Sequence, residues 1–245
     1  MIKTMGVAAA GATVLGFPMT GVAQDGSATP VKRRKLLVIG AHPDDPETCA
    51  GGTMCLFAQA GHEVVNVYLT RGEAGIEGMG PDEAAAVRVK ECEAASRVIG
   101  ARHIFMSQID GNTEVNLRRY KEMRDLIESE DPDIVITHWP IDSHRDHAAC
   151  GMLVLDAWRR LGRKWPLYYA EAMTGTQSQM FHPTHWVDIS SVADRKHEAC
   201  ACHVSQHMDV INEGWHFKME QFRGIECRCA AAEAFALHTT ALSML

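Results

Sequence analysis

Short apolar runs alternate along the chain with longer stretches in which apolar residues recur every three or four positions. The short runs are typical of strands buried on both faces, and the longer stretches are typical of amphipathic helices. We predict strands at residues 35–41, 63–70, 103–107, 133–137, 167–170 and 186–189, and helices at residues 47–60, 81–99, 114–129, 144–161, 191–207 and roughly 218–235. This order predicts an α/β fold with a mostly parallel sheet covered by helices on both faces.

The size and composition suit a single domain with a sizeable core. The chain has 245 residues, of which 46% are apolar and 22% charged. We place the domain at residues 35–245. The net charge of -7 argues against a nucleic-acid-binding protein, which normally presents a basic surface. After the N-terminal region, no apolar run is long enough to cross a bilayer.

The N-terminal region differs in composition from the rest of the chain. Lys3 precedes a stretch of small and apolar residues, and Gly21 and Ala23 provide small residues for a cleavage site after Ala23. This pattern predicts a secretory signal peptide at residues 1–24, followed by a linker at residues 25–34. The protein is then expected in the periplasm or outside the cell. The alternative is a cytoplasmic protein whose N-terminus is a disordered tail or a docked helix.

The eight cysteines leave the compartment open. Four of them lie on predicted helices and are expected to be buried as small apolar residues: Cys49, Cys55, Cys92 and Cys150. The other four form two close pairs, Cys200 with Cys202 and Cys227 with Cys229. These pairs can form disulfides in an exported protein, hold a second metal as thiolates, or stay unpaired.

Gly51 and Gly52 lie inside the first predicted helix, where the missing side chains let a helix approach a sheet closely. The pair does not form the Gly-x-Gly-x-x-Gly spacing of a dinucleotide site. The sequence therefore argues against a nicotinamide or flavin nucleotide as a cofactor.

A histidine and two carboxylates follow directly after the first apolar run: His42, Asp44 and Asp45. In open α/β sheets, ligands bind just beyond the carboxyl ends of the strands. Adjacent side chains at such a bend point in different directions. One carboxylate can therefore hold a metal while its neighbour moves protons.

A second cluster, with His144 and His147, follows the apolar run at residues 133–137. Three residues apart on a helix, the two rings share a face, and Asp142 or Ser143 can cap that helix. Two clusters at two strand ends predict one mononuclear metal site; the alternative is two unrelated loop or capping clusters. Two histidines and a carboxylate around an open position form a catalytic zinc arrangement, which lowers the pKa of a bound water to about 7.

These clusters carry a resemblance to a known family. Residues 40–47, with the glycine pair after them, resemble the signature of the LmbE-like, PIG-L family of deacetylases, and residues 144–147 resemble its second motif. Further resemblances spread over about residues 35 to 240: residues 70–73, 188–190, 205–206 and 232–235, together with Arg88, Glu91, Gly100 and Lys196. Pro46 departs from the usual family pattern, and we expect it to alter the local turn without removing a ligand.

The resemblance implies a Rossmann-like fold with one zinc ion per chain, bound by His42, Asp45 and His147. It implies that Asp44 is the base that activates the attacking water and the acid that protonates the leaving amine. The implied reaction removes the N-acetyl group from an N-acetylglucosamine-type sugar or glycoconjugate and releases acetate and a free amine. Assembly into a homo-oligomer is compatible with the resemblance.

The remaining roles that the resemblance implies concern the substrate and the transition state. His144 is expected to stabilise the tetrahedral oxyanion, with Asp146 orienting its ring. Arg71 is expected to contact a substrate hydroxyl, and Glu47 is expected to support the first motif from behind the ligands.

Two other functions fit the same residues. One is a metal-dependent amidase that acts on a non-sugar amide or a thiol conjugate; the other is a non-catalytic glycan-binding domain that retains the metal. Asp44 favours catalysis, because a binding domain has little use for a free carboxylate beside the ligands. The long segment at residues 173–183 is expected either to cover the mouth of the site or to be a mobile surface connection.

Overall fold

The computed structural model describes residues 32–239. The predicted signal peptide and most of the predicted linker lie outside these residues, so export of the protein stays a prediction. Within the described residues, no helix combines the length and the apolar character needed to cross a bilayer.

The described part of the chain forms one seven-stranded sheet in the order β3-β2-β1-β4-β5-β7-β6. Neighbouring strands from β3 to β5 are parallel, whereas β7 runs antiparallel to β5 and to β6. The prediction of an α/β fold with a mostly parallel sheet is confirmed. The strands are β1 (Lys35–Gly40), β2 (Glu63–Tyr68), β3 (Arg102–Phe105), β4 (Ile134–His138), β5 (Leu167–Ala170), β6 (His185–Asp188) and β7 (Ala232–Leu237).

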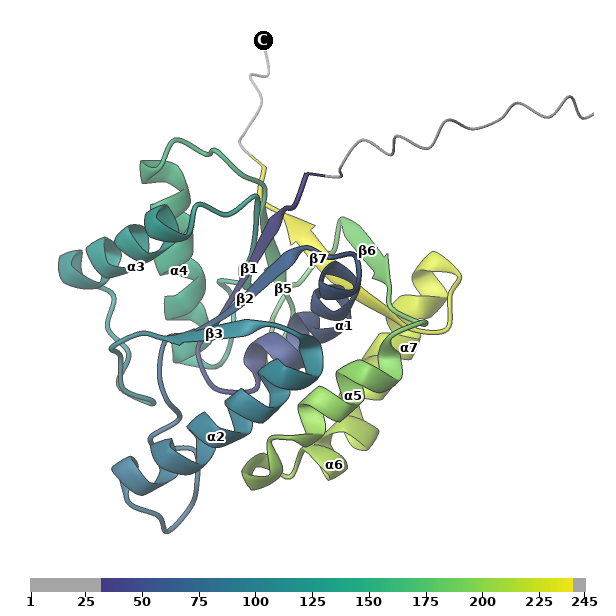
Figure 1. Ribbon diagram of the computed structural model, residues 1–245, viewed down its shortest axis with the longest axis horizontal. Coiled ribbons are helices and arrows are strands. Elements are labelled where there is room, and N and C mark those ends of the chain that lie inside the picture. The colour runs from purple at the N-terminus through teal and green to yellow at the C-terminus, as the bar shows by residue number, and fades with distance from the viewer. Residues whose placement is uncertain (1–31, 240–245) are drawn as a thin grey trace, which may run out of the picture. The chain divides into compact units, whose positions relative to one another are not determined.

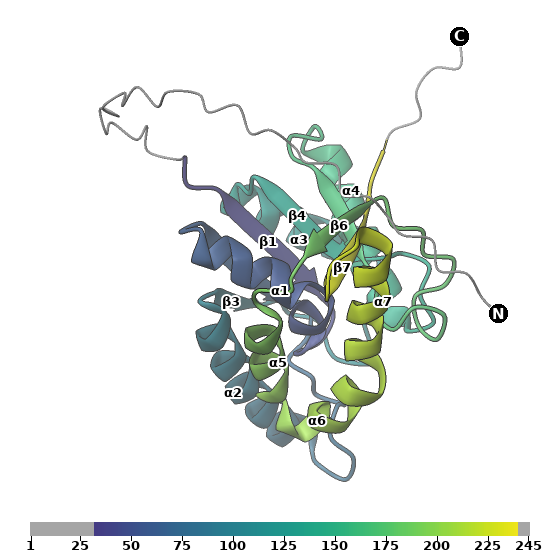
Figure 2. The same cartoon turned by 90° about the vertical axis from the view of Figure 1, so that its right-hand side faces the viewer.

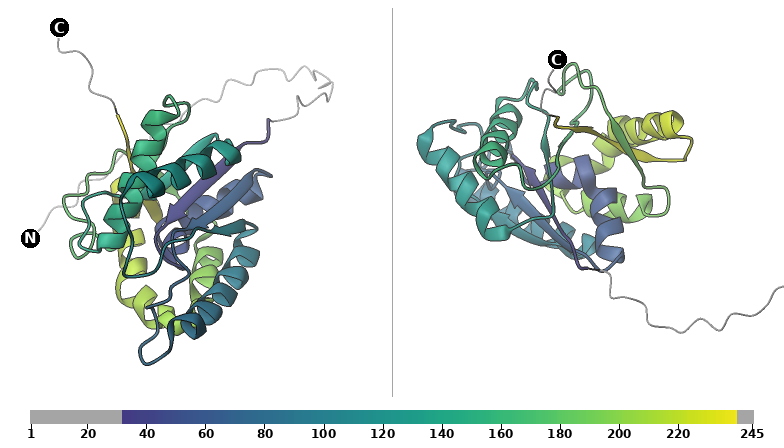
Figure 3. Two further views of the ribbon diagram at one scale, coloured as in Figure 1. Left: turned by 90° about the vertical axis from the view of Figure 1, so that its left-hand side faces the viewer. Right: turned by 90° about the horizontal axis from the view of Figure 1, so that it is seen from above.

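Helices cover both faces of this sheet (Figures 1 and 3). Helices α3 and α4 pack together on one face, and α1, α2 and α5 pack together on the other. The helices are α1 (Asp45–Gln59), α2 (Pro81–Ile99), α3 (Leu117–Glu130), α4 (Arg145–Arg160), α5 (Ala193–Ala201), α6 (Met208–Ile211) and α7 (Phe217–Cys227), with a 3-10 turn at Val204–Gln206 and a π-helical turn at Asn212–His216.

Strand β1 shows why a continuous apolar run predicts a strand here. Leu37 and Ile39 face the core shared with α3 and α4, whereas Leu36 and Val38 face the core shared with α1, α2 and α5. Because successive side chains of a strand point to opposite faces, a strand covered on both sides must be apolar at every position.

The C-terminal part differs from the prediction of one helix at residues 218–235. Helix α7 ends at Cys227, and β7 follows. Alanine-rich sequence favours a helix, but Arg228 adopts a left-handed conformation with φ of 65° that ends α7. The alanines that follow pair with β5 and β6. The predicted helix at residues 191–207 is also too long, because α5 ends at Ala201.

The chain leaves β1 and β4, which are neighbours in the sheet, toward opposite sides (Figure 2). It continues from β1 to β2 on one side and from β4 to β5 on the other. Such a switch point leaves a crevice at the carboxyl ends of the strands, where open α/β sheets bind ligands. His42 follows β1, and His144 and His147 follow β4, so the fold places both predicted clusters at this crevice.

Gly51 and Gly52 allow α1 to lie close to its neighbours, as the sequence predicted. A Cβ atom on Gly52 would come within 2.5 Å of Ile189 Cγ2, and one on Gly51 would come within 2.9 Å of Lys196 Cγ. Ala50, just before this pair, has non-helical backbone angles that kink α1. The close approach therefore occurs at the point where the helix changes direction.

We predict that Gly52→Ala lowers the free energy of unfolding by about 1 to 3 kcal/mol, because the added methyl group overpacks the contact with Ile189. Gly214→Ala is the matched control: nothing lies within 4 Å of the place where its Cβ would be, so we expect no loss of stability. Urea denaturation followed by circular dichroism measures both variants, and equal stabilities would contradict the close contact.

Candidate metal centre and active site

The Asp45 carboxylate lies at the centre of the site and is fixed by the main chain. Asp45 begins α1, a few residues after the end of β1. Its Oδ2 accepts the N–H of Ala41 at 3.0 Å and the N–H of His42 at 2.7 Å. These two hydrogen bonds hold the carboxylate in one orientation and close the turn between β1 and α1.

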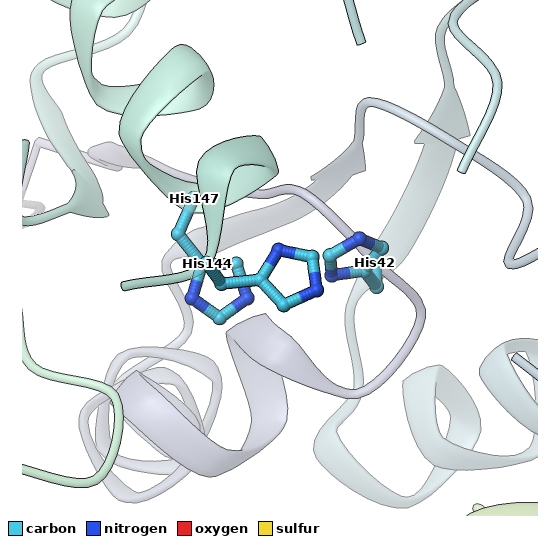
Figure 4. A group of neighbouring side chains, drawn as sticks. All are labelled: His42, His144 and His147. Carbon is cyan, nitrogen blue, oxygen red and sulfur yellow. The ribbon is translucent and has the colours of Figure 1, made fainter. Parts of the chain in front are cut away.

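Both histidines that were predicted as ligands contact this carboxylate. His42 Nδ1 lies 3.3 Å from Asp45 Oδ2, and His147 Nε2 lies 3.3 Å from Asp45 Oδ1. The centroids of the two rings are 5.3 Å apart, and Figure 4 shows both rings in one group with His144. The structure thus brings together the three residues that the sequence analysis assigns to the metal.

The second nitrogen of each of these histidines lies beside a further carboxylate. His42 Nε2 is 3.2 Å from both Asp110 Oδ1 and Asp146 Oδ2. His147 Nδ1 is 3.4 Å from Asp142 Oδ1. Metal-binding histidines are typically oriented in this way, with a carboxylate on the nitrogen that does not bind the metal.

The charges around the two rings favour a cation. Burial opposes protonation of His42, but Asp110, Asp146 and Asp45 outweigh it and raise the pKa of His42 well above its usual value. Burial also opposes protonation of His147, but Asp45 and then Asp142 raise its pKa to about 9. The carboxylates therefore favour positive charge at both rings. A divalent cation satisfies the same carboxylates and takes the place of protons on histidine ligands, so the donor set fits a metal ion.

His138 is a further donor, which the sequence analysis missed. It is the last residue of β4, its Nε2 lies 3.1 Å from Asp45 Oδ2, and its ring stacks on His147 with 4.0 Å between centroids. His138 forms a group of potential metal donors with Asp45 and His147, beside the group of His42, His144 and His147. Its place at the end of an apolar run was the signal that marked His42, and it could have been found in the same way.

Asp44 lies beside the donor groups and has a strained backbone. Its φ is 116°, in the left-handed region that residues with a side chain rarely adopt. Arg88 on α2 holds it in place, because Arg88 Nη2 donates to Asp44 Oδ2 at 3.0 Å and also to the main-chain carbonyl of Pro43. Burial raises the pKa of Asp44, and the charge of Arg88 offsets part of this effect. Arg88 resembles a family position in the sequence, but the sequence carries no signal of this contact with Asp44.

His144 is the N-cap residue of α4, and its ring is held in one tautomer. Its Nδ1 accepts the main-chain N–H of Asp146 at 3.3 Å. In a neutral ring the proton then lies on Nε2, which becomes a hydrogen-bond donor. Burial, followed by the charges of His147 and His42, lowers the pKa of His144 and favours this neutral form. The ring is therefore suited to donate to an oxyanion.

The carboxylate of Asp146 does not orient the His144 ring as expected. It accepts the N–H of Gly111 at 2.8 Å and the hydroxyl of Thr113 at 2.6 Å, and it contacts His42. Residues two apart on a helix do not face each other, so this side chain points from the first turn of α4 to the segment after β3. Asp146 thus supports His42, and only its main-chain N–H binds His144.

Asp44, His144 and the three predicted ligands line a cavity of about 300 Å³. This volume lies at the lower end of the range of small-molecule sites, about 300 to 1,000 Å³. The other walls come from α1, the segment before α2, α2, the segment after β3, the segment after β5 and residues 206–216. Their lining residues are Thr48, Ala74, Gly75, Arg88, Asp110, Ala172, Met173, Gln177, Gln206, Met208, Ile211 and His216.

Arg71, the predicted substrate contact, does not line this cavity. Its side chain is 48% exposed, and its Nε donates to Glu73 Oε1 at 3.1 Å. Glu73 also accepts the N–H of Asp110 at 3.2 Å, so this pair ties the end of β2 to the segment after β3. Asp110 lines the cavity and was missed, although it follows a predicted strand as the two clusters do.

Glu47 is buried behind the first motif, where the sequence analysis expected it to act. Its Oε1 accepts the hydroxyl of Tyr68 at 2.5 Å and the amide of Asn66 at 3.2 Å. Its Oε2 lies 3.7 Å from His203 Nε2. These contacts fix the first turn of α1 to β2 and to the segment after α5.

All eight cysteines are free thiols. Cys55, Cys92 and Cys150 are buried as expected, whereas Cys49 is partly exposed. The sulfur atoms of Cys227 and Cys229 lie 3.3 Å apart. Within residues 32–239, the groups of three potential metal donors contain histidine and aspartate only, so a thiolate metal site gains no support.

The site combines two histidines and an aspartate at the carboxyl edge of a Rossmann-like sheet with a further carboxylate beside them. These features define a class of α/β proteins in which a candidate metal site opens into a small-molecule pocket. Comparison with known proteins narrows this class. Residues 37–158 match the family model described as PIG-L, GlcNAc-PI de-N-acetylase. The chain belongs to the PIG-L (LmbE-like) family, which confirms the resemblance seen in the sequence.

The similar proteins include several that are named as deacetylases. Diacetylchitobiose deacetylase of Thermococcus kodakarensis is 30% identical over 197 residues, which cover 74% of this chain and 73% of the relative. Probable N-acetyl-alpha-D-glucosaminyl L-malate deacetylase 2 of Bacillus anthracis is 28% identical over 193 residues, which cover 74% of this chain and 84% of the relative. The solved structure of N,N'-diacetylchitobiose deacetylase from Pyrococcus horikoshii has a TM-score of 0.75 at 25% identity, with 84% of each chain covered.

We predict that the metal-free protein takes up one divalent ion per chain. We expect His147→Gln to weaken this binding by more than about 100-fold, because losing a metal ligand lowers the affinity more than losing the hydrogen-bond partner behind a ligand, which costs up to about 100-fold. His185→Gln, on the exposed strand β6, is the matched control and should bind as the wild type does. Competition with a chromophoric chelator measures both affinities. An unchanged affinity in His147→Gln would remove His147 from the ligand set.

Proposed function

We propose that this protein is a zinc-dependent deacetylase that hydrolyses the N-acetyl group of an N-acetylglucosamine-type sugar or glycoconjugate. The observation that carries this proposal is that Asp44 and His144 line the same cavity as the metal donors. One is a carboxylate with a raised pKa, and the other is a neutral ring with a fixed donor nitrogen. Relatives that are named as deacetylases of acetylated glucosaminyl compounds support the substrate class.

His42, Asp45 and His147 would hold the metal. Two imidazoles and one carboxylate with an open fourth position are typical of catalytic zinc sites. When bound, zinc polarises the amide carbonyl and lowers the pKa of water. His138 contacts the same carboxylate, but its Nε2 also lies 3.2 Å from the N–H of Ala41. We therefore assign His138 to the support of Asp45.

In this proposal Asp44 moves the proton. Its carboxylate takes a proton from the attacking water and later returns it to the nitrogen of the leaving amine. Arg88 holds one oxygen of this carboxylate in place. The Asp44 carboxylate contacts Arg88, whereas the Asp45 carboxylate contacts His42 and His147, so we assign the two adjacent carboxylates different tasks.

In this proposal His144 stabilises the negative charge that develops on the substrate. Attack on an amide carbonyl produces a tetrahedral oxyanion, and a donor that is already oriented stabilises it without reorganisation. Because Nδ1 of His144 accepts the N–H of Asp146, Nε2–H is the donor that remains.

The cavity walls suit a sugar. Arg88, Asp110, Gln177 and Gln206 line the cavity and provide both donors and acceptors for hydroxyl groups. Met173 adds an apolar surface. Ligand pockets commonly combine a few placed polar groups with apolar walls in this way.

We predict zinc-dependent release of acetate from N-acetylated amino sugars and a fall in kcat of about 10² to 10⁴ in Asp44→Asn, because the change removes the base and keeps the shape of the side chain. Asp125→Asn is the matched control, since this side chain is 52% exposed on α3, and it should retain the wild-type kcat. An enzyme-coupled acetate assay on a panel of N-acetylated sugars gives the rates, and mass spectrometry gives the zinc content of each variant.

Wild-type rates in zinc-loaded Asp44→Asn would show that another group is the base. Cleavage only of non-sugar amides or thiol conjugates would retain the chemistry and reject a sugar as the substrate. Zinc binding without turnover of any amide would reject catalysis in favour of a glycan-binding domain.

A further inference from the structure

The segment after β5 is fastened to the segment that leads into α4. The N–H of Ser143 donates to the carbonyl of Gln177 at 3.0 Å, and the N–H of Gln179 donates to the carbonyl of Ile141 at 2.9 Å. Between them, Asp142 and Ser178 form an isolated antiparallel bridge. Part of the segment at residues 173–183, for which the sequence left open a cover over the site or a mobile connection, is therefore tied to residues 141–143, directly before the second motif.

This segment also forms a wall of the cavity. Met173 and Gln177 line the cavity, and Ser178 is buried directly behind them, with 1% of its surface exposed. Ser178 Oγ accepts the N–H of Ala172 at 2.8 Å and donates to Asp142 Oδ2 at 3.0 Å. The hydroxyl of Ser178 thus joins both ends of the wall to one carboxylate.

The same carboxylate serves the metal donor His147. The side chain of Asp142 is fully buried, and its Oδ1 accepts the N–H of His144 at 2.8 Å. This Oδ1 also lies 3.4 Å from Nδ1 of His147, a buried atom that forms no hydrogen bond in the structure, so Asp142 is the charged group beside it. One oxygen of Asp142 therefore binds the wall of the cavity, and the other contacts the ring of the metal donor His147 and the main-chain N–H of His144.

We propose that Ser178 is a positioning residue that couples the cavity wall at residues 172–178 to His147 through Asp142. The proposal rests on the metal site of the proposed function. Seating of the wall orients Asp142, and Asp142 holds His147 with its Nε2 toward Asp45. A metal on Nε2 requires the proton of His147 on Nδ1, where it strengthens the contact with Asp142. Because coupling between two sites is reciprocal, metal binding must then stabilise the wall as much as the wall strengthens metal binding.

Two measurements on the full-length chain test this coupling without relying on activity. Zinc affinity is measured by competition with a chromophoric chelator. Hydrogen exchange with mass spectrometry is followed on the peptide that contains the amides of Ala172, Ser178 and Gln179, with and without zinc. The variants are Ser178→Ala and, as the matched control, Thr176→Ala. Thr176 is exposed, and its hydroxyl donates only to the carbonyl of Met173 within the same segment.

We expect Ser178→Ala to bind zinc about tenfold more weakly than the wild type, the loss that one hydrogen bond to a charged outer partner produces. Zinc should slow exchange of the wall peptide in the wild type and in Thr176→Ala, and this effect of zinc should disappear in Ser178→Ala. Melting of the metal-free proteins, followed by circular dichroism, shows that the variants are folded.

The proposal is overturned if Ser178→Ala binds zinc as the wild type does, or if zinc slows exchange of the wall equally in both. Equal losses in Thr176→Ala would also overturn it, because the effect would then belong to any hydroxyl of the segment. A failure of this kind leaves acetate release by the wild type unchanged, whereas failure of the proposed function removes zinc binding or acetate release from the wild type itself.

Discussion

The Asp45 carboxylate is the group on which the rest of the site depends. It is buried, with 7% of the residue exposed, and it binds the main chain of the β1–α1 turn and the rings of His42, His138 and His147. Removing the partner of a buried charge costs about 3 to 5 kcal/mol, whereas a strained backbone conformation costs about 1 to 3 kcal/mol. The contacts of Asp45 are therefore large enough to offset the backbone strain of Asp44 next to it.

A second network of buried charges holds the helix that begins with Asp45. Nζ of Lys196 on α5 lies 2.7 Å from Oε1 of Glu220 on α7 and 2.8 Å from Oε1 of Glu233 on β7. Glu233 in turn accepts the N–H groups of Gly52 and Thr53 on the kinked helix α1. Neither α5, α7 nor β7 contributes a residue to the predicted ligand set. Their network instead fixes the position of α1, so the C-terminal part of the chain supports a helix that supplies Asp45 to the site.

The features that the sequence predicted correctly have local signals. Apolar runs marked the strands buried on both faces, and polar clusters after two of them marked the residues that meet at Asp45. The misses depend on contacts between distant segments. Arg88 contacts Asp44 from α2, and the distance between the two residues along the sequence does not predict this contact. The alanines of β7 favour a helix in isolation and become a strand only by pairing with β5 and β6. Asp146 was expected to orient the ring of His144, two residues before it, but residues two apart on a helix do not face each other, and its carboxylate contacts His42.

Anomalous diffraction at the zinc absorption edge, from crystals of the protein soaked with zinc, tests the central claim most directly. We expect one anomalous peak per chain, from a zinc ion coordinated by His42, Asp45 and His147 and not by Asp44 or His144. Zinc coordinated by Asp45, His138 and His147 would contradict the assigned ligand set. Zinc coordinated by Asp44 would contradict the division between the carboxylate that holds the metal and the carboxylate that moves the proton.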